Sequence, residues 1–141
     1  MFTNILVPVD GSDNSYRALD AALILSEKLG SNITVIHVME EVPITHIGSE
    51  KLLNELLEAY KKENQDILSK CSEIATQKGL TINTFLLQGN PASVILDFSK
   101  KEKFDILIMG GRGLGKFKEL ILGSVSSKIV HHSPCAVLLI R

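Results

Sequence analysis

The chain has 141 residues, of which 45% are hydrophobic and 22% charged, with a formal net charge of −1. These values are ordinary for a globular protein, and we expect residues 1–141 to form a single domain. The near-neutral charge argues against nucleic-acid binding, which needs a basic surface. No apolar run approaches the ~20 residues of a membrane span, and no signal-peptide pattern opens the chain, so we expect a cytoplasmic protein.

The first elements alternate between apolar strands and helical patterns. Residues 5–9 are a short apolar run that Asp10-Gly11-Ser12-Asp13 interrupts, which predicts a buried strand, a turn and a helix start. Apolar residues at helical spacing follow until Gly30, which predicts a helix that ends there. Residues 33–38 predict a second buried strand.

A long helix is predicted over residues 49–78. If it is continuous, it measures roughly 45 Å, which is more than a small sheet can cover. We therefore expect its first turns to overhang the domain or to fold over a site. Its predicted apolar stripe consists of Leu53, Leu56, Leu57, Tyr60, Ile67, Leu68, Cys71, Ile74 and Ala75.

The second half of the chain continues the alternation. Strands are predicted at 81–87, 105–109 and 135–140, and helices at 92–99 and 124–131. Most of the strands are continuously apolar, which predicts burial on both faces. This pattern favours an α/β fold with a doubly wound five-stranded parallel sheet, in a Rossmann-like three-layer α/β/α arrangement.

Three residues with reactive side chains are interpreted as structural. Cys71 and Cys135 lack metal-ligand spacing and are expected to act as small apolar residues. His37 falls inside a predicted strand, where a hydrogen-bonded core histidine is commoner than a ligand.

The strongest chemical signal is a glycine-rich loop after the fourth strand. It ends at Gly123-Ser124, which opens a helix whose free N–H groups and positive dipole end suit a phosphate. Arg112 adds positive charge, as do Lys116 and Lys118. The loop is not a Walker A motif, because no Gly-Lys-Ser/Thr follows. Its glycines are Gly110, Gly111, Gly113 and Gly115.

The spacing Gly110-x2-Gly113-x9-Gly123-Ser124 resembles the ATP-binding signature of the universal stress protein family. Residues 5–12 and 134–140 also resemble that family, so the resemblance covers essentially the whole chain. The family contains members that keep this motif and bind ATP, and members that lack it and do not. The resemblance therefore implies the ATP-binding subgroup and the adenine nucleotide alpha hydrolase-like fold.

The resemblance also implies a set of nucleotide-binding residues. The adenine would lie near Val9 and Val38, and Asp10 would face the ribose or an Mg²⁺ ion held mainly by the ATP phosphates. Asp10 has an alternative interpretation, because an acidic residue after a strand can simply cap the next helix. The implied set is Pro8, Val9, Asp10, Val38, Met109, Gly110, Arg112, Gly113, Gly123, Ser124, Val125 and Ser126.

These observations favour an ATP-binding stress-response protein that acts as a nucleotide-dependent sensor or regulator. Any ATP hydrolysis should be slow, because no candidate base or water-positioning residue is evident. One alternative is an adenylating or pyrophosphate-releasing transferase on a related fold, although residues 10–15 only faintly resemble the loop of such enzymes. Another is a dimeric interaction module whose pocket binds no nucleotide.

The last strand predicts self-association. Residues 135–140 are apolar and are expected at the edge of the sheet, where unpaired backbone groups invite a second copy. A two-fold homodimer is the simplest closed assembly. The family resemblance implies the same dimer, with these strands antiparallel.

Overall fold

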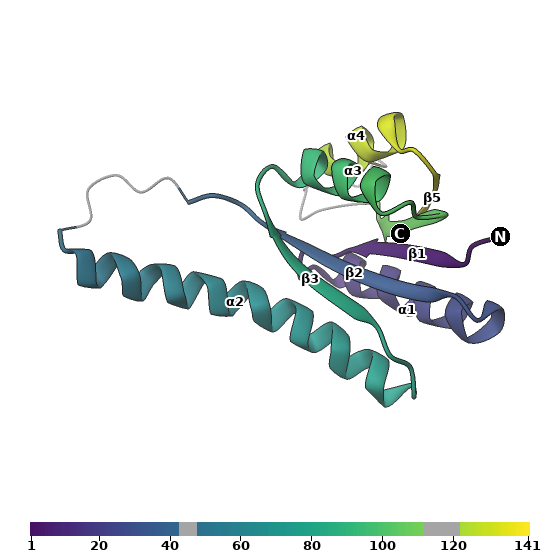
Figure 1. Ribbon diagram of the computed structural model, residues 1–141, viewed down its shortest axis with the longest axis horizontal. Coiled ribbons are helices and arrows are strands. Elements are labelled where there is room, and N and C mark those ends of the chain that lie inside the picture. Colours follow the sequence, from purple (N-terminus) through teal and green to yellow (C-terminus); the bar gives the residue numbers. More distant parts are fainter. Residues whose placement is uncertain (43–47, 112–121) are drawn as a thin grey trace.

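The computed structural model describes residues 1–42, 48–111 and 122–141. Within these ranges the chain forms a five-stranded parallel sheet with the strand order β3-β2-β1-β4-β5, which confirms the predicted doubly wound α/β fold (Figure 1). The strands are β1 (Asn4–Pro8), β2 (Asn32–Met39), β3 (Asn83–Gln88), β4 (Ile106–Gly110) and β5 (Ala136–Ile140). The helices are α1 (Asp13–Leu29), α2 (Glu50–Gln77), α3 (Pro91–Lys101) and α4 (Ser124–His132).

Helices cover both faces of the sheet. Successive side chains of a strand point to opposite faces, and β1 shows the division: Ile5 and Val7 pack in the cluster that includes α1 and α2, whereas Leu6 packs with α3 and α4. Ile5, Val7 and Leu6 are all fully buried. The continuous apolar run of β1 is therefore explained by burial on both sides.

Side chains that accept hydrogen bonds determine where three helices begin. Ser12 before α1, Ser49 before α2 and Asn90 before α3 each accept from the backbone amide three residues later, at 3.1 to 3.2 Å. Such caps satisfy one of the amides that a helix start leaves unpaired. The start of α4 differs, because its cap residue is Gly123, which forms no side-chain cap.

Helix α2 extends beyond the sheet. Its 28 residues measure about 42 Å, and in Figure 1 its first turns reach past the ends of β2 and β3. The predicted apolar stripe is correct from Leu68 onward but wrong for Leu56 and Leu57, which are 51% and 40% exposed because they lie in the overhang. Neither α2 nor any other helix in the described ranges is both long and apolar enough to cross a membrane.

We expect the two cysteines to differ in reactivity. Cys71 is fully buried, and this burial raises the pKa of its thiol to about 11, with Lys70 partly opposing the shift. Cys135 is only partly buried, and both thiols are free. At pH 8 a thiol with that pKa is ionised about 100-fold less often than an ordinary cysteine, and the thiolate is the reactive form.

The test is reaction with Ellman's reagent at pH 8. A Cys135→Ser variant, which retains only Cys71, should react at least about 100-fold more slowly than a Cys71→Ala variant. Both variants should react equally fast in denaturant. Equal rates for the two folded variants would contradict the burial of Cys71.

Candidate functional site

A cavity of about 650 Å³ lies at the carboxyl ends of β1, β2 and β4. The chain passes from β1 to β2 and β3 on one side and later to β4 and β5 on the other, so the cavity sits where the strand order reverses. Ligands of open α/β sheets bind at this switch point. The volume is also in the usual range for small-molecule sites.

The predicted site residues gather around this one cavity. Arg112 and Gly113 lie outside the residues that the structure describes. All ten of the others line the cavity, although they come from four separate segments of the chain. They are Pro8, Val9, Asp10, Val38, Met109, Gly110, Gly123, Ser124, Val125 and Ser126.

The wall formed by β1 and β2 opens because β1 is the shorter strand. Pro8 is the last residue of β1 and pairs with Ile36, and the Val9 amide then donates to the Ile36 carbonyl at 2.8 Å. The chain turns away at Asp10, whereas β2 continues through Val38 to Met39. The end of β2 therefore borders the cavity along the edge where β1 no longer pairs with it.

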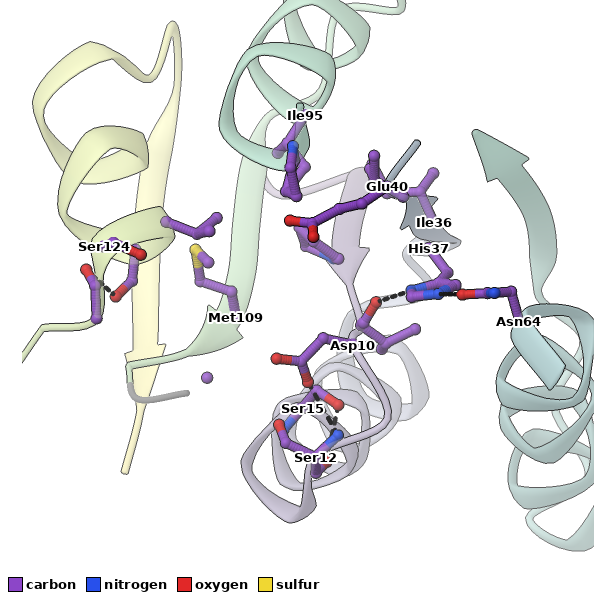
Figure 2. A pocket seen from close by; sticks show the side chains of 18 of the residues that line it. Asp10, Ser12, Ser15, Ile36, His37, Glu40, Asn64, Ile95, Met109 and Ser124 are labelled. Carbon is purple, nitrogen blue, oxygen red and sulfur yellow. Dashed lines mark hydrogen bonds between the residues drawn. The ribbon is translucent and has the colours of Figure 1, made fainter. Parts of the chain in front are cut away.

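Asp10 does not cap helix α1. Its Oδ1 accepts from the Ser12 amide at 2.9 Å, and Ser12 is the residue that caps the helix by accepting from the Ser15 amide. The capping alternative for Asp10 is therefore wrong. Figure 2 shows the Asp10 carboxylate directed into the cavity.

Gly110 is needed for the contact between β4 and α1. A Cβ atom added at this position would lie 2.9 Å from the Asn14 Cβ, which is closer than real Cβ contacts, and 3.0 Å from the Asn14 carbonyl carbon, which is tighter than most. The absent side chain thus lets the strand end and the helix start meet at the cavity wall. This structural role adds to the predicted one of lining the site.

The two ends of the glycine-rich loop are held together below the cavity. The Gly123 amide donates to the Gly111 carbonyl at 3.0 Å, and the Ser126 hydroxyl lies 3.1 Å from the same carbonyl and 3.2 Å from that of Gly123. Ser126 is 3% exposed. Its hydroxyl hydrogen is therefore used within the protein, whereas Ser124, two residues earlier in α4, is exposed.

Several lining residues were missed by the sequence analysis. His37 is buried and hydrogen-bonded as expected, but it also lines the cavity. Its Nδ1 lies 2.8 Å from the Val9 carbonyl oxygen and its Nε2 lies 2.6 Å from Asn64 Oδ1. The signal for Asn64 was available, because this polar residue interrupts the apolar stripe of α2 at helical spacing.

Glu40 and Tyr60 complete the wall near the end of β2. The Tyr60 hydroxyl donates to the Glu40 backbone carbonyl at 2.9 Å, which ties α2 to the segment after β2. Figure 2 shows the Glu40 carboxylate directed into the cavity on the side of Asp10. No sequence pattern linked these two residues, since they come from different elements.

The described lining is acidic. It contains the carboxylates of Asp10 and Glu40, and within the described ranges no lysine or arginine lines the cavity. The same part of the chain contains no cluster of three histidine, cysteine or acidic residues that could hold a metal ion.

Comparison with known proteins identifies the family. The family model for the universal stress protein family matches residues 1–141. The chain belongs to the universal stress protein family. It is 36% identical to universal stress protein YxiE of Bacillus subtilis and 38% identical to a universal stress protein of Thermus aquaticus, with full coverage of both chains in each case.

Solved structures of the family have the same fold. The structure of UspA from Lactobacillus plantarum superposes with a TM-score of 0.84 at 30% identity, covering 99% of this chain and 98% of that one. An Arabidopsis thaliana family member with AMP bound superposes with a TM-score of 0.73 at 23% identity, covering 98% of this chain and 90% of that one. A family member in complex with cAMP also matches, with a TM-score of 0.63 at 23% identity, covering 99% and 96%. These last two likenesses show the fold.

The close contact at Gly110 yields a stability prediction. A Gly110→Ala variant should lose about 1–3 kcal/mol of unfolding free energy, because the added methyl group presses on the Asn14 backbone. Gly48→Ala is the matched control, since nothing lies within 4 Å of a Cβ at that position. Urea denaturation of the two variants measures the difference. Equal stabilities would show that the contact between β4 and α1 is looser than the structure has it.

Proposed function

We propose that this protein binds adenine nucleotides in the cavity, as ATP with Mg²⁺, and that it acts as a nucleotide-dependent regulator in a stress response. The observation that carries the proposal is the start of α4, a helix N-terminus without a side-chain cap that lines the cavity opposite the end of β2. Family membership supports it, since members of this fold are known with AMP and with cAMP bound.

The phosphates would lie at the start of α4. Gly123, Ser124, Val125 and Ser126 all line the cavity there, and the first amides of a helix are left without intrahelical partners. These amides and the positive end of the helix dipole together favour an anion. The exposed Ser124 hydroxyl adds a further donor.

The base would lie at the end of β2. The backbone groups of every second strand residue face the same neighbouring strand, and the Ile36 carbonyl faces β1. The Val38 backbone groups face the same way, beyond the point where β1 turns off. An amide donor next to a carbonyl acceptor complements N1 and the N6 amino group of adenine, while the N1–H and O6 of guanine have the opposite order.

Mg²⁺ would lie between the phosphates and Asp10. Carboxylate and phosphate oxygens are the ligands that Mg²⁺ prefers, usually with one or two protein carboxylates. The Ser12 amide holds one oxygen of Asp10 and thereby orients the carboxylate toward the cavity. The ion would also offset the charge of Asp10, which otherwise repels a phosphate.

Chemical turnover should be slow. Phosphoryl transfer to water requires a residue that orients the attacking water. The described lining near α4 contains only glycine, serine and apolar residues. We expect ATP hydrolysis well below ~1 s⁻¹, the low end of ordinary enzymes. Faster turnover would place the protein among the enzymes instead.

We also propose a homodimer through the last strand. β5 lies at one edge of the sheet, and Leu138 on it is 38% exposed. An apolar edge strand pairs readily with a second copy, and two-fold symmetry closes the assembly.

The phosphate contact can be tested with two variants at one position. Ser124→Pro removes a backbone amide while leaving the helix intact, because proline is favoured at the first helical position and Gly123 has the extended conformation that precedes it. Ser124→Ala removes only the hydroxyl. By calorimetry, native protein should bind MgATP with a micromolar Kd, and Ser124→Pro should bind about tenfold more weakly than Ser124→Ala.

Adenosine provides the control for this comparison, since it lacks phosphates and should bind both variants alike. Equal MgATP affinities for the two variants would remove the start of α4 from the phosphate site. Absence of binding by the native protein would overturn the nucleotide proposal and favour an interaction module.

The dimer is tested by placing a charge on the sheet edge. Leu138→Glu should convert the dimer to a monomer in light scattering at micromolar concentration, because two copies of the carboxylate would meet at the interface. Leu52→Glu on α2 is the control, since Leu52 is 47% exposed and α2 packs against β2 and β3, toward the sheet edge opposite β5. A native monomer, or loss of the dimer in the control alone, would contradict this interface.

A further inference from the structure

His37 forms two hydrogen bonds at the cavity wall. It is 7% exposed, and its Nδ1 lies 2.8 Å from the Val9 carbonyl oxygen. A carbonyl oxygen only accepts hydrogen bonds, so Nδ1 carries the proton and donates it. Asn64, which is 8% exposed, places its Oδ1 2.6 Å from Nε2. An amide oxygen also only accepts, so Nε2 is the donor in this second hydrogen bond.

The Val9 carbonyl has an alternative partner. After the bond from the Val9 amide to the Ile36 carbonyl, a continuing parallel ladder would pair the Val38 amide with the Val9 carbonyl. Among the hydrogen bonds of the described residues, that carbonyl accepts from His37 Nδ1 and not from the Val38 amide. The imidazole thus pairs with the Val9 carbonyl, which would otherwise accept from the Val38 amide and extend the pairing of β1 with β2.

Asn64 holds the ring in this orientation. Its Nδ2 donates to the Tyr60 carbonyl at 2.7 Å, which fixes the amide against its own helix. The amide is therefore anchored on α2 and presents its Oδ1 to His37 Nε2, which donates to it. Figure 2 shows the chain of contacts running from α2 through Asn64 and His37 to the end of β1.

We propose that His37 is a positioning residue for base selection and that Asn64 orients it. By donating a hydrogen bond to the Val9 carbonyl, His37 keeps the backbone amide and carbonyl of Val38 free for an adenine base. This inference rests on the proposed nucleotide function. It adds that selection between adenine and guanine depends on the His37 side chain, which lies behind the Val38 backbone groups that it keeps unpaired.

Replacement of His37 distinguishes its hydrogen bond from its volume. His37→Leu removes the donor, so the Val9 carbonyl accepts from the Val38 amide instead, and the Val38 backbone is no longer free for a base. His37→Asn is the matched variant, because its Nδ2 is bonded to Cγ as the histidine Nδ1 is and can donate to the same carbonyl. The readout is the ratio of Kd values for MgGTP and MgATP, since the two ligands share the phosphate contacts.

We expect this ratio to fall about tenfold in His37→Leu and to stay near the native value in His37→Asn. Asn64→Leu should lower the ratio less, because the ring loses its orientation but keeps its donor. Gln65→Leu, at an exposed neighbouring position of α2, should leave the ratio unchanged. A native ratio in His37→Leu, or an equal fall in Gln65→Leu, would overturn the proposal.

Hydrogen exchange of the Val38 amide provides a test that needs no ligand. In ligand-free protein this amide should exchange much faster than that of Ile36, which lies within the ladder. It should become protected in His37→Leu but not in His37→Asn. If Val38 is already protected in the native protein, the positioning role is wrong.

The two tests separate the two proposals. A native protein that binds no adenine nucleotide, but shows the expected exchange at Val38, would overturn the nucleotide function and retain the role of His37 at the end of β1. Nucleotide binding by the native protein, with the same ratio of Kd values and the same Val38 exchange in His37→Leu, would retain the nucleotide function and overturn the role of His37.

Discussion

The early departure of β1 from the sheet is the constraint on which the pocket depends. β1 pairs with β2 only from Asn4 to Pro8, whereas β2 continues to Met39 and remains paired with β3. The turn is enforced locally by Gly11, whose φ of 85° suits glycine, and by Ser12, which caps α1. A longer first strand would fill the space between the ends of β2 and β4 with backbone.

The chemistry of the pocket follows from what its described walls contain. The proposed anion binding at the start of α4 would rely on amides and the helix dipole, which have fixed positions and need no side-chain ordering. The nearby carboxylates of Asp10 and Glu40 oppose a phosphate unless a cation accompanies it. Under the proposed function, this balance favours a metal-bound polyphosphate over a bare one as the ligand of these walls.

Much of the fold was predictable because its determinants are local. Continuous apolar runs identified most of the strands, and Gly30 ends α1 in the left-handed conformation as expected. The apolar stripe of α2 was only half correct, because periodicity predicts an amphipathic face but not where the sheet beneath it stops. Leu56 and Leu57 satisfy the pattern and still face solvent.

The site residues also differ in how far the sequence alone could predict them. Residues next to strand ends, such as Asp10 and Gly110, were predictable, since parallel strands bring their carboxyl ends to one edge. The contact between His37 and Asn64 was not, because the two residues are 27 positions apart and their meeting depends on how α2 packs. The role of Gly110 beside Asn14 was missed for a similar reason, as it depends on a tertiary contact.

Helix α2 is the element that joins the pocket to the surface. It reaches the cavity through Tyr60 and Asn64, and within two to three turns toward its start it carries the exposed side chains of Leu52 and Leu56. A helix transmits displacement along its length because its backbone hydrogen bonds keep it stiff, with about 1.5 Å of rise per residue. Any ligand that shifts His37 acts on Asn64 through a hydrogen bond of 2.6 Å. Regulation by a nucleotide requires that the bound and free states differ at a surface which a partner can sense. Under the proposed function, α2 would connect the base end of the pocket to such a surface.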